Sequence, residues 1–120
     1  MGAALSGGNG ATNGTFISYE AGTRKGEWTG KFVHANGDVM EGNVRKGMLH
    51  GKGKYVFKNG DVYVGEFRQS KFEGKGRYLF QRSGDSYDGE WRYDQMHGRG
   101  KYTYGNGDVY LGMWKDGRAD

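Results

Sequence analysis

Histidine is the residue type in this sequence with the clearest capacity for acid–base or metal chemistry, and the chain has 3 of them. His50 and His97 stand at equivalent positions of an internal repeat, two units apart, and the unit between them has Glu73 instead. With neighbouring strands ~4.8 Å apart, two hairpins separate these histidines by roughly 20 Å, too far to share a metal ion. Repeat position explains them as polar residues of the connectors between hairpins, and we expect no metal site.

Aspartates and glycines also recur at fixed intervals. Asp61, Asp85 and Asp108 each follow a turn glycine, so they are interpreted as turn residues and not as a catalytic carboxylate pair. Gly51 and Gly53 flank one residue, as in phosphate-binding loops, but no helix follows to supply an N-terminal dipole. The chain has 0 Cys, which excludes disulfides and zinc–thiolate sites. The sequence therefore predicts a protein that is not an enzyme and has no cofactor.

The amino-terminal residues match the pattern for N-myristoylation. Gly2 becomes the terminal residue once Met1 is removed, small residues follow, and Ser6 holds the fifth place from Gly2. Residues 1–13 are rich in Gly, Ala, Ser and Asn, which predicts a flexible arm. One myristoyl chain binds membranes only marginally, with an association constant of ~10⁴ M⁻¹. A lipid anchor at Gly2 would therefore need a second membrane signal.

Basic residues could supply that second signal. The formal net charge is +4, and residues 30–75 hold nine Lys or Arg against five Asp or Glu. Each basic residue near an anionic leaflet contributes about 1 kcal/mol. The alternative interpretation is an ordinary solvated face with a modest surplus of lysine. The candidate lipid-binding residues are Lys31, Arg45, Lys46, Lys52, Lys54 and Lys71.

The elements that carry these residues belong to a repeat. The chain has 25 Gly, 0 Pro and only 34% hydrophobic residues, yet its aromatic residues recur at fixed intervals, which favours a repeat array over a globule. Units that begin at Gly30, Gly53, Gly76 and Gly100 are 23, 23 and 24 residues apart. We predict an array over 14–120, with a degenerate capping unit at 14–29. The full units are 30–52, 53–75, 76–99 and 100–120.

Each unit is interpreted as a β-hairpin. Residues 55–57 and 62–64 are β-prone and flank a turn signal at 58–60. A two-residue turn would divide the large apolar residues between the two faces of the sheet. A three-residue loop with a left-handed glycine instead pairs Tyr55 with Tyr63 and collects the large apolar residues on one face. We favour this register because a sheet must bury its large apolar groups together.

The predicted fold class is therefore all-β, an elongated single-layer antiparallel sheet of tandem 23-residue hairpins. Glycines between the rings, and the twist of the sheet, make its aromatic face a shallow groove for a protein partner. Lys54 and Arg77 point away from that face, so no nucleic-acid partner is expected. The predicted groove residues are Tyr55, Phe57, Tyr63, Phe67, Tyr78, Phe80, Tyr87, Trp91, Tyr102, Tyr104, Tyr110 and Trp114.

The string Gly-Lys-Gly-Lys-Tyr…Asn-Gly-Asp-Val-Tyr-x-Gly-x-Trp/Phe resembles the MORN (membrane occupation and recognition nexus) repeat. The resemblance covers 30–114 well and 14–28 weakly. It departs from the pattern where Met40 and Val44 replace the usual aromatic residues. It implies an elongated sheet of hairpins without catalysis, in scaffolds at membranes, cytoskeletal structures and large assemblies. Some members hold a partner helix or extended segment, some dimerise, and phosphoinositide binding has been proposed for others.

The resulting functional prediction is a scaffold or assembly module that binds a protein partner along the aromatic groove. Its predicted location is cytoplasmic, at a membrane face or cytoskeletal structure. The alternatives are a phosphoinositide or anionic-lipid binding module, and an accessory subunit of a larger complex. The last unit also lacks the closing segment of the others, which predicts an open edge near 110–114. Such an edge invites another strand, from a second copy or from a capping partner.

Overall fold

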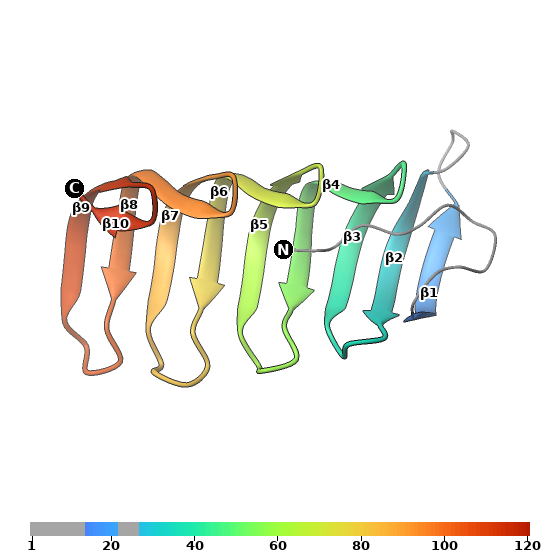
Figure 1. The fold of residues 1–120 in the computed structure, drawn as a ribbon, viewed down its shortest axis with the longest axis horizontal. Coiled ribbons are helices and arrows are strands. Elements are labelled where there is room, and N and C mark those ends of the chain that lie inside the picture. The colour runs from blue at the N-terminus through green and yellow to red at the C-terminus, as the bar shows by residue number, and fades with distance from the viewer. Residues whose placement is uncertain (1–13, 22–26) are drawn as a thin grey trace.

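The computed structural model describes residues 14–21 and 27–120, and their regular secondary structure is a single sheet of strands. The strands are β1 (Gly14–Ala21), β2 (Glu27–His34), β3 (Val39–Arg45), β4 (Met48–Val56), β5 (Val62–Arg68), β6 (Lys71–Leu79), β7 (Ser86–Arg92), β8 (Gln95–Thr103), β9 (Val109–Lys115) and β10 (Arg118–Ala119). They pair antiparallel in sequence order from β1 to β10 (Figure 1). No helix in these ranges is long and apolar enough to cross a membrane. The predicted all-β class is confirmed.

One long edge of the sheet, the turn edge, consists of the loops at 34–38, 57–61, 80–85 and 104–108. In the second loop the Gly60 N–H donates to the Phe57 carbonyl, and the Phe57 N–H donates to the Asp61 carbonyl, each at 2.9 Å. Gly60 has a φ of +96°, the left-handed conformation that glycine tolerates. Tyr55 therefore pairs with Tyr63, which confirms the predicted register.

This register places glycines opposite one another through the middle of the sheet, including Gly53 opposite Gly65 and Gly65 opposite Gly76. A Cβ on Gly76 would collide with the ring of Tyr63, and one on Gly100 would collide with the ring of Tyr87. The glycines thus leave the space in which tyrosine rings lie flat against the sheet.

The opposite edge differs from the prediction. His50 and His97, which we expected in connectors, lie inside β4 and β8. Consecutive hairpins are joined by two-residue turns, in which central residues such as Ser70 and Asp94 have φ values of 64° and 66°. Left-handed central residues match the right-handed twist of the flanking strands, as in type I′ turns. These tip turns are 45–48, 68–71, 92–95 and 115–118.

A bulge bends each of the first three tips over the aromatic face. Gly65 pairs with Gly76 and Phe67 pairs with Phe72, so Glu66 alone faces residues 73–75. The Lys75 N–H donates to Glu66 Oε2 at 2.6 Å, which holds the irregular strand in place. Figure 1 shows the upper part of each hairpin bent relative to the lower part. The sheet is therefore folded over along this edge.

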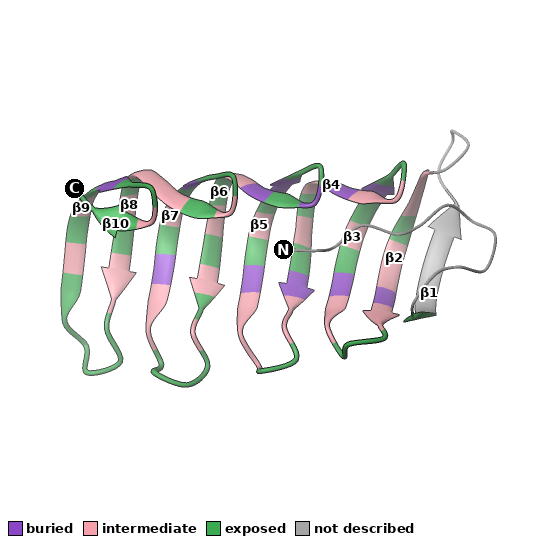
Figure 2. Cartoon of the chain, in the orientation of Figure 1, coloured by how far each residue is buried: buried purple, intermediate pink, exposed green. Residues whose placement is uncertain are grey.

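The bent tips are hydrogen-bonded to one another in series. The Ser70 N–H donates to the Leu49 carbonyl at 3.0 Å, and the Leu49 N–H donates to Ser70 Oγ at 3.1 Å. Asp94 makes the same two contacts with Phe72, at 3.1 and 2.7 Å. We call this series of tips the tip layer. It covers a continuous core, and the buried apolar residues lie within the strands, whereas the turn edge is mostly exposed (Figure 2).

Candidate binding surfaces

The aromatic face is the first candidate surface. The structure brings the predicted groove rings together on one face, but it buries half of them. Leu49 and Phe72 of the tip layer belong to the same buried cluster, and Phe72 stacks on Tyr63. The prediction that all of these rings line an open groove is therefore wrong for the buried ones, which pack in the core. The buried rings are Tyr55, Tyr63, Phe67, Tyr87, Trp91 and Trp114.

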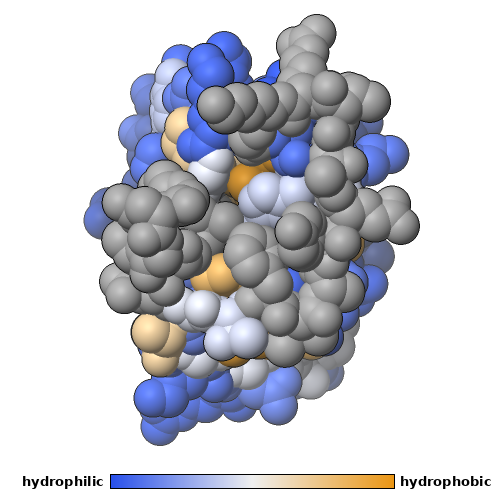
Figure 3. Space-filling view, turned by 90° about the vertical axis from the view of Figure 1, so that its right-hand side faces the viewer, coloured by the Kyte–Doolittle hydropathy of each residue, from blue (hydrophilic) through white to orange (hydrophobic). Residues whose placement is uncertain are grey.

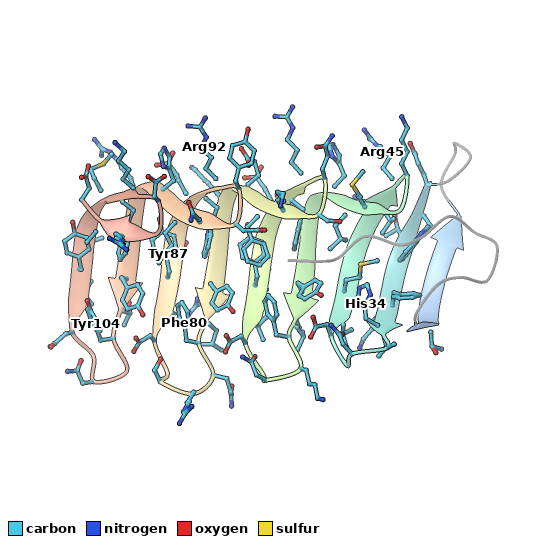
Figure 4. All side chains as sticks on the ribbon, viewed as in Figure 1. His34, Arg45, Phe80, Tyr87, Arg92 and Tyr104 are labelled. Carbon is cyan, nitrogen blue, oxygen red and sulfur yellow. The ribbon has the colours of Figure 1, made fainter. Side chains whose placement is uncertain are left out.

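The remaining rings form a continuous half-exposed row, which we call the ring ladder: Phe57, Tyr78, Phe80, Tyr102 and Tyr104. Successive ring centroids along this row are 5.9, 4.5, 6.0 and 4.8 Å apart. Figure 4 shows Phe80 and Tyr104 near the turn edge, each in its own hairpin. Tyr110, the other predicted ring, is half-buried and packs edge-on against Trp114 at 5.4 Å.

A cleft of about 310 Å³ runs between the ring ladder and the tip layer. Phe57, Tyr78 and Phe80 line it from the sheet, and Gln95 and Met96 line it from a tip. This cleft is what remains of the predicted groove after the tips bend over. Its lining is mostly aromatic and aliphatic, which suits an apolar side chain of a partner.

Aspartates of the turn edge join each unit to the next. Asp85 accepts hydrogen bonds from the Tyr102 hydroxyl and from the Gly105 N–H, both at 2.7 Å. Asp61 and the Tyr78 hydroxyl repeat the contact at 2.7 Å. The hydrogen bond from Tyr102 lowers the pKa of the Asp85 carboxyl. Burial, with the hydrogen bond to Asp85, raises the pKa of Tyr102. These aspartates therefore tie units together.

Burial raises the pKa of the Tyr87 hydroxyl to about 12, further from physiological pH than its ordinary value of about 10. Within residues 14–21 and 27–120, no three His, Asp or Glu side chains converge on a possible metal position. The aromatic face can bind by packing and hydrogen bonding.

Comparison with known families agrees with this geometry. The MORN repeat profile matches three consecutive stretches, 41–62, 63–84 and 87–109, which cover more than half of the chain. The chain belongs to the MORN repeat family. A search of curated proteins finds no match. MORN repeats are protein- and membrane-binding modules that are not known to be catalytic.

The predicted lipid-binding residues fall into two separate groups on the MORN array. Lys31 and Lys54 both pair across the sheet with Glu41 on the outer face, the face opposite the rings, and Lys52 is on that face too. The other three residues are at the tip turns: Arg45, Lys46 and Lys71. Gly2 lies outside the described residues. The predicted set is therefore not one patch.

The tip turns of the MORN array form a basic surface of which only Arg45, Lys46 and Lys71 were predicted as binding residues. Arg45, Arg68, Arg92 and Lys115 each precede the central residues of a tip turn and are exposed. With Lys46, Lys71 and Arg118 they form what we call the basic tip edge. The tip turns hold seven basic residues and two acidic ones, a net charge of +5, whereas the loops of the turn edge hold two basic and four acidic ones, −2. Basic residues recur in the sequence at positions 45, 68, 92 and 115. That they share one edge follows only once the tip turns are known.

Proposed function

We propose that this MORN array is a scaffold that binds a helix or extended segment of another protein along the ring ladder. The observation that carries the proposal is the continuous row of half-exposed rings beside an apolar cleft. Rings of this kind have a large contact area at low conformational cost, and they dominate binding energy at many interfaces. Anchoring within a cytoskeletal or membrane-associated assembly is part of the same proposal.

A photo-crosslinking side chain at Tyr104 tests it, because Tyr104 is 46% exposed and outside the buried core. The matched control places the same crosslinker at Val64, which is 51% exposed on the outer face of the inner strand β5. We expect a defined partner to be captured from position 104 and not from 64. Phe80→Ala should weaken binding of that partner by at least about tenfold, as for aromatic residues central to an interface. Equal capture from both positions would contradict the proposal.

Attachment to the cytoplasmic face of a membrane is proposed separately, from Gly2 and Ser6. Intact-mass measurement of natively expressed protein should show an added myristoyl group that Gly2→Ala removes. An unmodified amino terminus would rule out the anchor and leave the binding proposal in place.

A further inference from the structure

The basic tip edge has an exposed cation at the same position of each successive tip turn: Arg45, Arg68, Arg92 and Lys115. Neighbouring strands are ~4.8 Å apart, so equivalent residues of successive units are ~9.6 Å apart, and three intervals from Arg45 to Lys115 span ~29 Å. Figure 4 shows Arg45 and Arg92 standing along the same edge and directed away from the ribbon. Seen from the β1 end, the described residues at the top and bottom are hydrophilic, and hydrophobic surface shows only in small areas between them (Figure 3). The row is therefore a solvated surface separate from the ring ladder.

Contacts within the chain leave most of this charge available. Arg45 Nε lies 3.5 Å from a Glu27 carboxylate oxygen, and Lys71 Nζ lies 3.8 Å from one of Asp94. Both are long, partly exposed pairs, which hold their cations weakly. The Arg92 guanidinium lies over the Tyr93 ring at 5.5 Å, a contact that leaves its charge uncancelled. With +5 on the tip turns and +4 on the whole chain, this edge accounts for the net positive charge of the protein.

We propose that the basic tip edge binds an acidic helix of another protein, with carboxylates recurring every seventh residue along one face. Seven residues of an α-helix rise ~10.5 Å, close to the ~9.6 Å between units, and long arginine side chains can absorb the accumulated difference. Side chains on one face of an extended strand recur every ~6.7 Å, which does not match. Three of the four residues in the row are arginines, whose planar guanidinium suits paired contacts with carboxylates.

The negative groups on the same edge also favour a rod-shaped partner over a flat one. Asp116 belongs to a tip turn and is exposed, so it would face any lamella laid against this edge. Asp94 is held within the tip layer by the Phe72 N–H. A helix along the row can present its carboxylates to the arginines and leave Asp116 facing solvent. Such a helix needs only one line of carboxylates to match the row of basic side chains. This binding does not depend on the ring ladder and goes beyond the proposed function.

Fluorescence anisotropy with a labelled synthetic helix tests the proposal. The probe has about four heptads with one glutamate stripe, and the comparison peptide has the same composition with its glutamates spread around the helix. We expect the striped peptide to bind more tightly. The variant Arg68→Gln/Arg92→Gln should weaken its binding by about tenfold, since two charge-assisted contacts are removed. The control Lys54→Gln/Lys101→Gln removes the same charge from the outer face and should change affinity by less than about twofold.

A charge exchange confirms direct contact. Arg68→Glu should abolish binding of the striped peptide, and replacing one stripe glutamate by lysine should restore it in part. Circular dichroism melting of each variant establishes that the array is folded. Equal binding of both peptides, or equal losses from the tip and outer-face variants, would overturn the proposal. So would tip-dependent binding to phosphatidylcholine vesicles containing about a third phosphatidylserine together with no binding of the striped peptide.

Discussion

Tyr63 and Phe72 stack face to face, with their ring centroids 3.8 Å apart and their planes 6° from parallel. Tyr63 is in the flat part of β5, and Phe72 is in the part of β6 that bends over it. The Tyr63 ring is therefore enclosed between Phe72 and the backbone at Gly76. This stack joins the two parts of a bent hairpin, so it belongs to the core and cannot be a contact for a partner.

Gly76→Ala should destabilise the array, because the new Cβ would overlap the Tyr63 ring and its hydroxyl. We expect the free energy of unfolding to fall by about 2–3 kcal/mol, as for overpacking in a dense core. Urea unfolding followed by tryptophan fluorescence measures the change.

The matched control is Gly51→Ala, at a position with open space around it but a φ of +77°. Its cost comes from backbone conformation alone and should be about 1–2 kcal/mol. If Gly76→Ala costs less than Gly51→Ala, the tight packing of Tyr63 on Gly76 is refuted.

The turn edge could be predicted from the sequence and the tip layer could not, for a physical reason. Asn59-Gly60 is a strong turn signal, and the requirement to bury large rings together selected one register. In two tip turns the left-handed residues are Gln69-Ser70 and Tyr93-Asp94, without a glycine to mark them. Their conformation depends on hydrogen bonds to the preceding tip, which a sequence pattern does not reveal.

For the same reason, the sequence predicted which rings share a face but not which of them are buried. Alternation along each strand was enough to assign the rings to one face. Their burial depends on Leu49, Phe72 and Met96, which reach the rings only after the strand bends at the bulge. Only three residues of the basic tip edge, Arg45, Lys46 and Lys71, were predicted, because the tip turns that bring the others beside them could not be recognised in the sequence.

Ser70→Ala should weaken the tip layer. Ser70 Oγ accepts a hydrogen bond from the buried Leu49 N–H at 3.1 Å, and alanine leaves that donor without its acceptor. The expected loss is about 1–2 kcal/mol of unfolding free energy, measured by urea titration. Gln69→Ala is the control, since Gln69 is exposed and has a similar φ of 50°. Equal effects would assign the loss to the turn backbone and not to this bond.

Asp85→Asn should lower the melting midpoint and change its dependence on acid. The folded state lowers the pKa of Asp85, chiefly through the Tyr102 hydroxyl. The stabilisation is therefore complete above the ordinary carboxyl pKa of about 3.9 and is lost as pH falls through the lowered value. The difference between wild type and variant should shrink below about pH 4 in melting curves. Asp88→Asn, on the outer face, controls for the charge change, and an equal shift there would contradict the role of the Tyr102 bond.

Self-association through β9 remains a prediction from the sequence. Of the described residues only 118–120 bond to the side of β9 away from β8: Arg118 and Ala119 pair with it, and the Asp120 N–H donates to the Met113 carbonyl at 2.9 Å. Leu111 is 73% exposed and Met113 is 48% exposed on its outer face. Leu111→Lys/Met113→Lys should reduce dimer formation in sedimentation experiments on the 120-residue chain, because charged side chains block strand addition. Val64→Lys on the inner strand β5 should leave dimer formation unchanged. A wild-type chain that is monomeric at every concentration tested would contradict the prediction.

His34→Phe should stabilise the array. His34 occupies the loop position that Phe57 and Phe80 hold in later units, and it packs on Phe32 with centroids 5.0 Å apart. Its Nε2 atom is buried without a hydrogen-bond partner, which costs about 1–3 kcal/mol. Phenylalanine removes that cost, so we expect the free energy of unfolding to rise by about 1 kcal/mol in urea titrations at neutral pH.

The gain from His34→Phe should grow on acidification. Burial lowers the pKa of His34, and the charge of Asp38 opposes that shift only in part. A lowered pKa in the folded state means that the unfolded chain takes up the proton first, so wild type loses stability as pH falls below about 6.5. The phenylalanine variant has no imidazole to protonate at this position. The difference in unfolding free energy between variant and wild type should therefore grow as the pH falls from about 7 to about 5.5. His97→Phe, in β8 and outside the turn edge, controls for the effect of adding a phenylalanine. A His34→Phe variant less stable than wild type at both pH values would show that the imidazole has a stabilising role.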